Sequence, residues 1–427
     1  FFEADRIEFR QQIAVDVGQL RDLAPGIDAK QVVRSLDAVH REQDRAVGQR
    51  YRRMGRALGA AMLAASVCVA AAPSRAETPE EFDKPTVLHA VDTAPARLLL
   101  GPGFRVEDAV PTDGLTARFT ILSDVGVFEA WGVETLALRV AEIPAIRLLD
   151  EACRSDAFAR AAANTAARPL EAGGSGLGRF FSDAPAAESS PVAADREKEL
   201  RAAARRLGVD PYTTNPLLAV RLDQIARVAA TGRVSMGALL PSAMPSSIAV
   251  PGSEIAHHWV YDLPADELRA KNAQRLRDFG AADEPIRALQ AAAGFTLSTQ
   301  TALVEVLGRL ADVQGRADVV ALAATAATPD QALYLVSAVS ILADRNEQAP
   351  IDVLLARGTL VARQKGGQLV APLPADYVSW NERTARFAQR EDLAATERGV
   401  WVTGRTTSRA RARFEALGWA VHEGVQP

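Results

Sequence analysis

The side chains best suited to metal chemistry lie together in the run His257-His258-Trp259-Val260-Tyr261-Asp262. On a helix, His258 and Asp262 would share one face, because residues four apart are neighbours, and an imidazole and a carboxylate are both metal ligands. Pro264, however, predicts that the helix begins only after Asp262, with Asp262 or its neighbours in the cap. Structural packing is therefore the favoured interpretation of this run, and we expect no metal site.

Acid–base chemistry has one further candidate, Asp376, in the aromatic and polar segment Pro-Leu-Pro-Ala-Asp-Tyr-Val-Ser-Trp-Asn. A carboxylate there could act as a general base if a pocket removed it from water. A hydrolase would have to bring it together with His257, His258 or His422 from distant parts of the fold. This is the weaker of two hypotheses for function, because no histidine lies near Asp376 in the sequence.

Two loops have the aromatic and polar composition of a binding surface. Residues 376–381 follow an expected hairpin, and residues 210–216 carry two prolines before a helix whose first N–H groups would attract anions. The alternative for both is structural, as a turn anchored to the core by aromatic rings and as a helix cap. The candidate binding residues of these loops are Asp210, Tyr212, Asn215, Tyr377 and Trp380.

Several classes of site are missing from the sequence. There is no Gly-x-Ser-x-Gly elbow, no His-Glu-x-x-His and no calcium-loop pattern, and no Lys-Ser or Lys-Thr follows the glycines of residues 173–178. We therefore expect no cofactor. The formal net charge of −4 argues against a nucleic-acid partner.

An export signal is the clearest motif. Basic residues 52–56 precede an uncharged stretch at 57–72, and Ser74-Arg75-Ala76 forms a small-residue cleavage site. We expect a start at Met54, a signal peptide over 54–76, and an upstream segment at 1–53 that is not part of the native protein. The mature protein would be periplasmic or secreted and would have no membrane span. The alternative is an uncleaved anchor, which would make the chain a membrane-tethered structural protein.

One thiol, Cys153, would remain after cleavage, because Cys68 lies in the signal. No disulfide could then form within the chain, so an apolar core has to hold the fold. A chain of this length predicts two or three domains.

The mature chain predicts an α+β fold that is predominantly helical. Residues 77–165 should form a small antiparallel β-meander, with strands at 104–106, 115–122 and 125–130, followed by helices that Pro144 kinks or divides. Residues 166–195 are rich in glycine, serine and proline, which predicts a flexible linker.

A central helical bundle is expected over 196–346, because one-sided apolar stripes follow one another there. Its start signals are Asn215-Pro216 and Thr328-Pro329-Asp330-Gln331. Residues 347–427 should form a mixed α/β unit, with a hairpin through Gly366-Gly367 and a strand–helix–strand from Trp401 to His422 that joins it.

Three segments together resemble a family of exported bacterial proteins for which no activity is known. They are Leu-Gly-Val-Asp-Pro-Tyr-Thr-Thr-Asn-Pro at 207–216, Ser-Thr-Gln-Thr at 298–301 and Ala-Leu-Gly-Trp at 416–419. The resemblance covers roughly residue 77 to the end and implies a signal-bearing protein of mixed sheet and helix. The leading hypothesis is a non-catalytic binding or scaffolding protein of the bacterial cell envelope with an unknown envelope or extracellular partner. A hydrolase acting on an envelope or extracellular substrate is the alternative.

Overall fold

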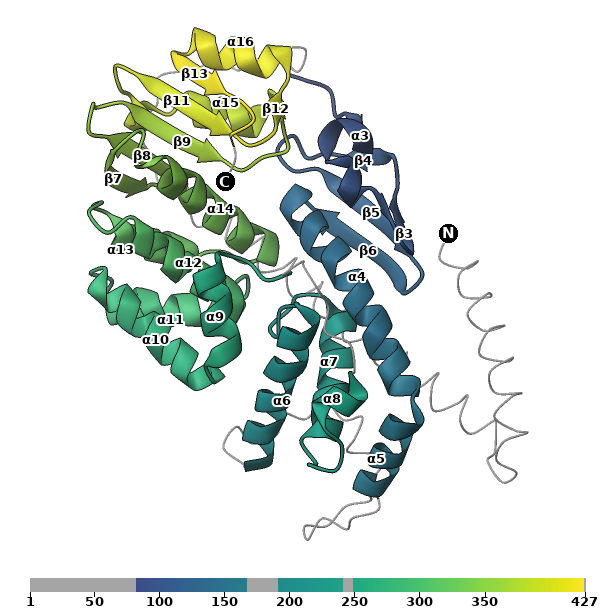
Figure 1. Cartoon of the computed structure of the whole chain (residues 1–427). Helices are drawn as coiled ribbons and strands as arrows, with labels where there is room; N and C mark the ends of the chain where they lie inside the picture. The colour runs from purple at the N-terminus through teal and green to yellow at the C-terminus, as the bar shows by residue number, and fades with distance from the viewer. Residues whose placement is uncertain (1–81, 167–190, 241–248, 426–427) are drawn as a thin grey trace, which may run out of the picture. The chain divides into compact units, whose positions relative to one another are not determined.

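The structure is a computed structural model that describes residues 82–166, 191–240 and 249–425 (Figure 1). All of them belong to one unit, Thr78–Pro427, and the other unit is Phe1–Glu77. The expected upstream segment 1–53, the signal 54–76 and most of the linker 166–195 lie outside the described residues. Helix is more abundant than strand, and the predicted α+β class is confirmed.

The predicted meander is confirmed and has one more strand than expected. Four antiparallel strands pair in the order β2-β3-β5-β6. Strands β1 and β4 form a separate antiparallel pair. Phe119 and Ile121 alternate with more exposed neighbours, so one face of the sheet is buried. The elements are β1 (Val87–His89), α3 (Ala90–Thr93), η2 (Ala96–Leu98), β2 (Leu100–Gly101), β3 (Phe104–Val106), β4 (Ala109–Pro111), β5 (Arg118–Ser123) and β6 (Gly126–Trp131).

Helix α4 (Val133–Arg154) covers the buried face of this sheet and runs without interruption through Pro144. The predicted division at Pro144 is therefore wrong. The next helix, α5 (Asp156–Ala166), begins twelve residues later, where the Ser155 hydroxyl accepts a hydrogen bond from the Phe158 N–H at 3.1 Å. Proline removes one helical hydrogen bond, but Ile143 and Ile146 beside it are fully buried, and their burial offsets that loss.

The predicted succession of helices is confirmed between residues 191 and 345. Residues 191–195, which we expected in the linker, belong to the first of these helices instead. Asn215 caps one helix and Thr328 caps another, both followed by proline as predicted. The helices are α6 (Pro191–Leu207), α7 (Pro216–Ala229), α8 (Met236–Leu239), α9 (Glu254–Asp262), α10 (Ala265–Asp278), α11 (Asp283–Ala291), α12 (Leu297–Arg309), α13 (Arg316–Ala323) and α14 (Pro329–Arg345).

The histidine pair lies inside α9, so the prediction of a helix that begins only after Asp262 is wrong. The Ser253 hydroxyl caps α9 by accepting a hydrogen bond from the Ala256 N–H at 3.4 Å. Asp262 is the last residue of α9, and Pro264 caps the following helix, α10. Proline therefore separates two helices here, and the earlier one starts from a serine cap that the sequence analysis overlooked.

The C-terminal residues form a five-stranded sheet with the order β13-β11-β9-β8-β7. The predicted hairpin is β8–β9, and the predicted strand–helix–strand unit adds to it, because β11 pairs in parallel with both β9 and β13. The elements are β7 (Ile351–Ala356), β8 (Leu360–Gln364), β9 (Leu369–Leu373), β10 (Tyr377–Val378), α15 (Glu382–Ala388), η3 (Glu391–Leu393), β11 (Arg398–Val402), β12 (Arg405–Thr406), α16 (Ser408–Ala416) and β13 (Trp419–His422).

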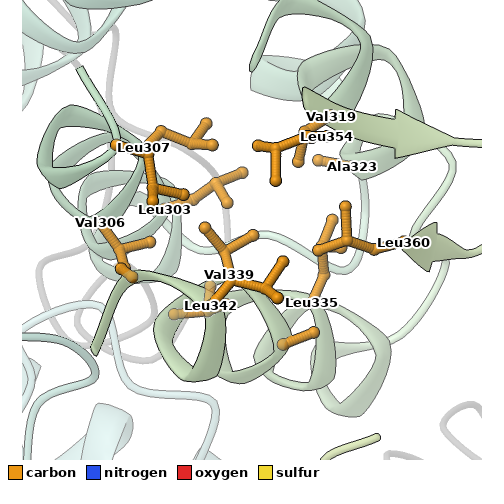
Figure 2. Close-up of a cluster of buried hydrophobic side chains, with 14 of the residues drawn as sticks. Leu303, Val306, Leu307, Val319, Ala323, Leu335, Val339, Leu342, Leu354 and Leu360 are labelled. Carbon is orange, nitrogen blue, oxygen red and sulfur yellow. The ribbon is translucent and has the colours of Figure 1, made fainter. Parts of the chain in front are cut away.

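One apolar core joins the helices to this sheet (Figure 2). Leu303 and Leu307 of α12 and Val339 of α14 pack with Leu354 of β7 and Leu360 of β8. Helix α14 lies against β8 and β9. The core therefore extends across residue 346, and the division of the chain into domains stays a prediction. Within the described ranges, no helix is both long and apolar enough to cross a membrane.

Replacing a leucine in this core tests how tightly it is packed. Leu303 is 0% exposed, whereas Leu100 on β2 is 72% exposed. We expect Leu303→Ala to lower the free energy of unfolding by about 3 kcal/mol, because it removes buried methyl groups and leaves a cavity. Leu100→Ala, the matched control, should change it by less than about 0.5 kcal/mol. Urea unfolding measures both, and equal effects would contradict the packing.

Candidate functional site

Side chains from five segments line a cavity of about 180 Å³, which we call the Asp210 cavity. The segments are the end of β6 with α4, the loop before α7, residues 249–251, and the first turns of α12 and α14. Its lining residues are Glu129, Trp131, Thr135, Leu138, Arg139, Glu142, Asp210, Thr213, Thr214, Ala249, Pro251, Thr296, Thr299, Pro329, Asp330 and Leu333.

Glu142 is the most deeply buried acid at the cavity, with 2% of its surface exposed. Its Oε2 accepts hydrogen bonds from Arg139 Nη1 at 2.9 Å and from Asn215 Nδ2 at 2.7 Å. Its Oε1 accepts from the Thr213 hydroxyl at 2.7 Å. Arg139 donates its other terminal nitrogen, Nη2, to the Thr214 hydroxyl. A buried carboxylate is tolerated when it is paired and hydrogen-bonded in this way, so the network fixes α4 to the loop.

The loop itself is shaped by its own side chains. Gly208, at φ 68°, ends α6 in the left-handed region that favours glycine. The Asn215 side chain then caps α7 by accepting from the N–H groups of Leu217 at 3.1 Å and Leu218 at 3.4 Å. Asn215 thus makes the cap that the structural alternative predicted, and it also donates to Glu142.

Asp210 stands at the start of this loop and is 4% exposed. Its Oδ1 accepts hydrogen bonds from the Tyr212 N–H at 2.8 Å and from the buried Ser298 hydroxyl of α12. No described residue donates a hydrogen bond to its other oxygen, Oδ2. Burial raises the pKa of Asp210 to about 7, against the lowering effect of those two hydrogen bonds. The carboxyl therefore exchanges its proton near neutral pH.

A third acid, Asp330, lies in the first turn of α14. Burial raises its pKa, and the positive charge of Arg139 and a hydrogen bond with Thr135 oppose that rise. The helix dipole also favours a negative charge at this position. The cavity therefore has a buried carboxyl group, Asp210, in the loop before α7 and a partly buried one, Asp330, on α14.

Asp376, the candidate general base, lies elsewhere and has a structural role. Its Oδ2 accepts a hydrogen bond from the Ala117 N–H at 2.9 Å, and its Oδ1 accepts from the Val133 N–H at the start of α4 at 3.1 Å. Burial raises the pKa of Asp376. The neighbouring Glu134, whose pKa burial also raises, bonds with the Ser337 hydroxyl of α14. Asp376 thus attaches the β-meander and α4 to the C-terminal strands.

The histidines do not meet Asp376. His257 Nε2 lies 2.9 Å from the Val250 carbonyl oxygen, His258 lies on an exposed face between Glu254 and Asp262, and His422 is exposed on β13. In the part of the chain that the structure describes, Asp376 has no hydrogen bond or ion pair with any of them. The hydrolase hypothesis as built on these residues has no contact to support it.

His258 and Asp262 share a helix face, with His258 Nδ1 3.8 Å from Asp262 Oδ2. Across the described ranges, however, no group of three or more histidine, cysteine, aspartate or glutamate side chains is arranged to hold a metal ion. The pair is best understood as a partly exposed contact between neighbouring turns of α9.

The two candidate binding loops have different surroundings. Trp380 is fully buried, with its ring centre 5.7 Å from that of Phe414, so it anchors the core as the structural alternative predicted. Tyr377 lines a shallow pocket of about 290 Å³ with His89 and Arg405. Asp210 lines the Asp210 cavity, whereas Tyr212 packs against a small apolar cluster with Leu268.

Sequence reasoning missed Arg139, Glu142, Ser298 and Asp330. A signal for two of them exists, because Arg139 and Glu142 are three residues apart on a helix and Glu142 precedes the buried Ile143. A charged residue next to an apolar stripe is buried with that stripe, and a buried charge needs an ionic or hydrogen-bonding partner. Asp330 and Ser298 carry no such signal, since both look like ordinary residues of a helix first turn.

Comparisons of the chain with protein-family models, with curated proteins and with solved structures find no match. The resemblance to exported bacterial proteins therefore stays a prediction. The functional assignment depends on the chemistry of the Asp210 cavity.

The pH dependence of stability tests the burial of Asp210. Its pKa is about 7 in the folded protein, against 3.8 for an ordinary aspartate, so between these values the folded state holds a proton that the unfolded state loses. Stability therefore falls as pH rises from about 4 to about 7 and is level above that. Asp210→Asn stays neutral, so we expect it to gain stability relative to the wild type over this range, by on the order of 4 kcal/mol.

Urea unfolding of both proteins at about pH 4 and about pH 8 measures this difference. Asp266→Asn is the control, because the Asp266 side chain is 92% exposed and should show no such trend. A pH-independent difference between Asp210→Asn and the wild type would show that Asp210 is not held in a desolvated site.

Proposed function

We propose that this chain is an exported protein of the bacterial cell envelope, periplasmic or secreted, that binds a small polar ligand in the Asp210 cavity. The observation that carries the proposal is the Oδ2 oxygen of Asp210, which belongs to a residue that is only 4% exposed at a cavity and receives no hydrogen bond from the described residues. An oxygen that is open to a cavity can accept a hydrogen bond from whatever enters it. A hydrogen bond to a charged group contributes about 1.5–3 kcal/mol, and a ligand that donates to this oxygen gains that free energy.

The rest of the lining supports binding. The Glu142 network holds its side chains in place before any ligand arrives, which reduces the entropy lost on association. A volume of about 180 Å³ corresponds to about six water molecules in the liquid. The ligand is therefore a small molecule, or one end of a larger one, and it would meet both carboxyl groups and the apolar side chains of Leu138 and Leu333.

Catalysis in the same cavity is the second candidate function, with Asp210 rather than Asp376 as the general base. A general acid or base works best when its pKa lies near the operating pH, and the pKa of about 7 of Asp210 meets this condition. Binding remains the preferred function, because the hydroxyl next to Asp210, on Ser298, is fully buried and has no histidine partner among the described residues.

Export is tested by amino-terminal sequencing of the protein from fractionated bacterial cells. We expect a mature start near Glu77 in the periplasmic or secreted fraction, because Ser74-Arg75-Ala76 is the cleavage site that the sequence predicts. Recovery from the membrane fraction with residues 57–72 retained would favour the membrane-tethered alternative. Recovery from the cytoplasm would remove the export proposal.

Filling the cavity tests the binding function. Leu333 lines the cavity and is only partly buried, so Leu333→Trp should fill it with little loss of stability. In ligand-observed NMR with small cationic, neutral and anionic polar compounds, we expect at least one compound to bind the wild type and to lose about tenfold or more in affinity to Leu333→Trp. Leu100→Trp, on the exposed strand β2, is the control and should bind normally.

If Leu333→Trp leaves binding unchanged, the site lies elsewhere. If no class of compound binds the wild type, the proposed function is wrong. Chemical conversion of a bound compound, detected by mass spectrometry and lost in Asp210→Asn, would favour the enzyme over the binding protein.

A further inference from the structure

We propose that the Asp210 cavity takes a small organic cation, a protonated amine with a short polar chain. The proposal rests on the proposed binding function and names its ligand class. It stands on three features of the cavity, which are its balance of charges, the hydrogen-bonding capacity that remains in it, and its size.

Acidic groups outnumber basic groups in the lining. Glu129, Glu142, Asp210 and Asp330 face the cavity, and Arg139 is its one basic residue among those that line it. Arg139 is occupied by Glu142 and Thr214, and Glu129 pairs with Arg118. No ion pair in the described residues involves Asp210 or Asp330. These two carboxyl groups are therefore the ones that a cationic ligand would pair.

The first turns of α12 and α14 also face the cavity, and helix amino termini favour anions. One N–H group of each first turn is already bonded to the capping hydroxyl. The Thr296 hydroxyl accepts from the Thr299 N–H at 3.2 Å, and the Thr328 hydroxyl accepts from the Gln331 N–H at 3.3 Å. Each helix end is equivalent to about half a positive charge. Two half charges are less than the negative charge of the acids that Arg139 does not pair.

The remaining hydrogen-bonding capacity is mainly for donors on the ligand. An ammonium group has three N–H donors and no acceptor, so it requires oxygen atoms. Asp210 Oδ2 and the Asp330 carboxyl offer them. Both guanidinium nitrogens that Arg139 directs to its neighbours are already bonded, so an anionic ligand would find few donors.

The volume of the cavity limits the part of a ligand that can enter it. The cavity holds about six water volumes, and a chain of three carbons with an amine and a hydroxyl fits this space. Leu138 and Leu333 provide apolar contacts for the carbons, and Trp131, which is 38% exposed, also lines the cavity. The Trp131 ring already holds one cation, because the Arg118 guanidinium lies 5.6 Å from its centre. A metal ion is a weaker candidate, because the described residues include no group of three suitable ligands.

Three compounds of equal length separate the classes of ligand. They are 3-aminopropan-1-ol as the cation, propane-1,3-diol as the neutral analogue and 3-hydroxypropionate as the anion. With the full chain, titration followed by ligand-observed NMR should show the amine binding about tenfold or more tightly than the other two. Asp210→Asn and Asp330→Asn should each weaken binding of the amine about tenfold and leave the weak binding of the diol unchanged.

Asp266→Asn is the charge-matched control and should bind the amine normally, since Asp266 is an exposed residue of α10 that does not line the cavity. Asparagine at 210 keeps an acceptor for Tyr212 and Ser298, so loss of binding is not loss of the fold, and thermal unfolding verifies this. If the diol or the acid binds more tightly than the amine in a way that Leu333→Trp blocks, the cation is wrong and the binding function stands. If none of the three binds, the cation proposal is overturned, and the wider set of compounds used for Leu333→Trp decides the binding function separately.

Discussion

The buried carboxylate of Glu142 is the constraint on which the rest of the site depends. Removing such a charge from water costs several kcal/mol, and only a complete set of partners offsets this. Arg139, Thr213 and Asn215 supply that set, from the same helix and from the loop before α7. If the loop moved away from α4, the buried Glu142 carboxylate would lose the hydrogen bonds from Thr213 and Asn215. Asp210, at the beginning of the same loop, is thereby held at the edge of the cavity.

Helix α4 carries this constraint into the whole described structure. Leu136 and Ile143 belong to the core of the β-meander, while Ile146 and Leu149 belong to the core formed with α6 and α7. At its first turn, the Val133 N–H donates to Asp376, which connects the helix to the C-terminal strands. A helix that is buried along most of one side accommodates Pro144, because packing rather than backbone hydrogen bonding stabilises it. Asp376, which the sequence offered as a catalytic base, therefore has a structural role, because it connects α4 to the C-terminal strands.

The sequence predicts features that short stretches determine. Asn215 and Thr328 were recognised as caps because the side-chain oxygen and the following proline act within four residues, and the β8–β9 hairpin follows from Gly367 at φ 88°. The joining of β11 and β13 to this hairpin also follows, since two apolar strands require a sheet, whereas the parallel direction of β11 beside β9 was not predicted. The Asp210 cavity does not follow, because α4, the loop and α14 are separated by about seventy or more residues and meet only through tertiary packing.

Asp210 distinguishes a structural role from a functional one more clearly than any other residue of the cavity. The turn that it begins uses a single oxygen, which accepts from Tyr212 and Ser298. An asparagine would offer the same acceptor without the penalty of desolvating a charge, so the shape of the loop does not require a carboxyl group. What the carboxyl adds is a second oxygen and a negative charge at the cavity. The second oxygen can accept a hydrogen bond from a molecule in the cavity, and the negative charge attracts a cation. A ligand with N–H donors and a positive charge therefore fits the site better than a neutral one.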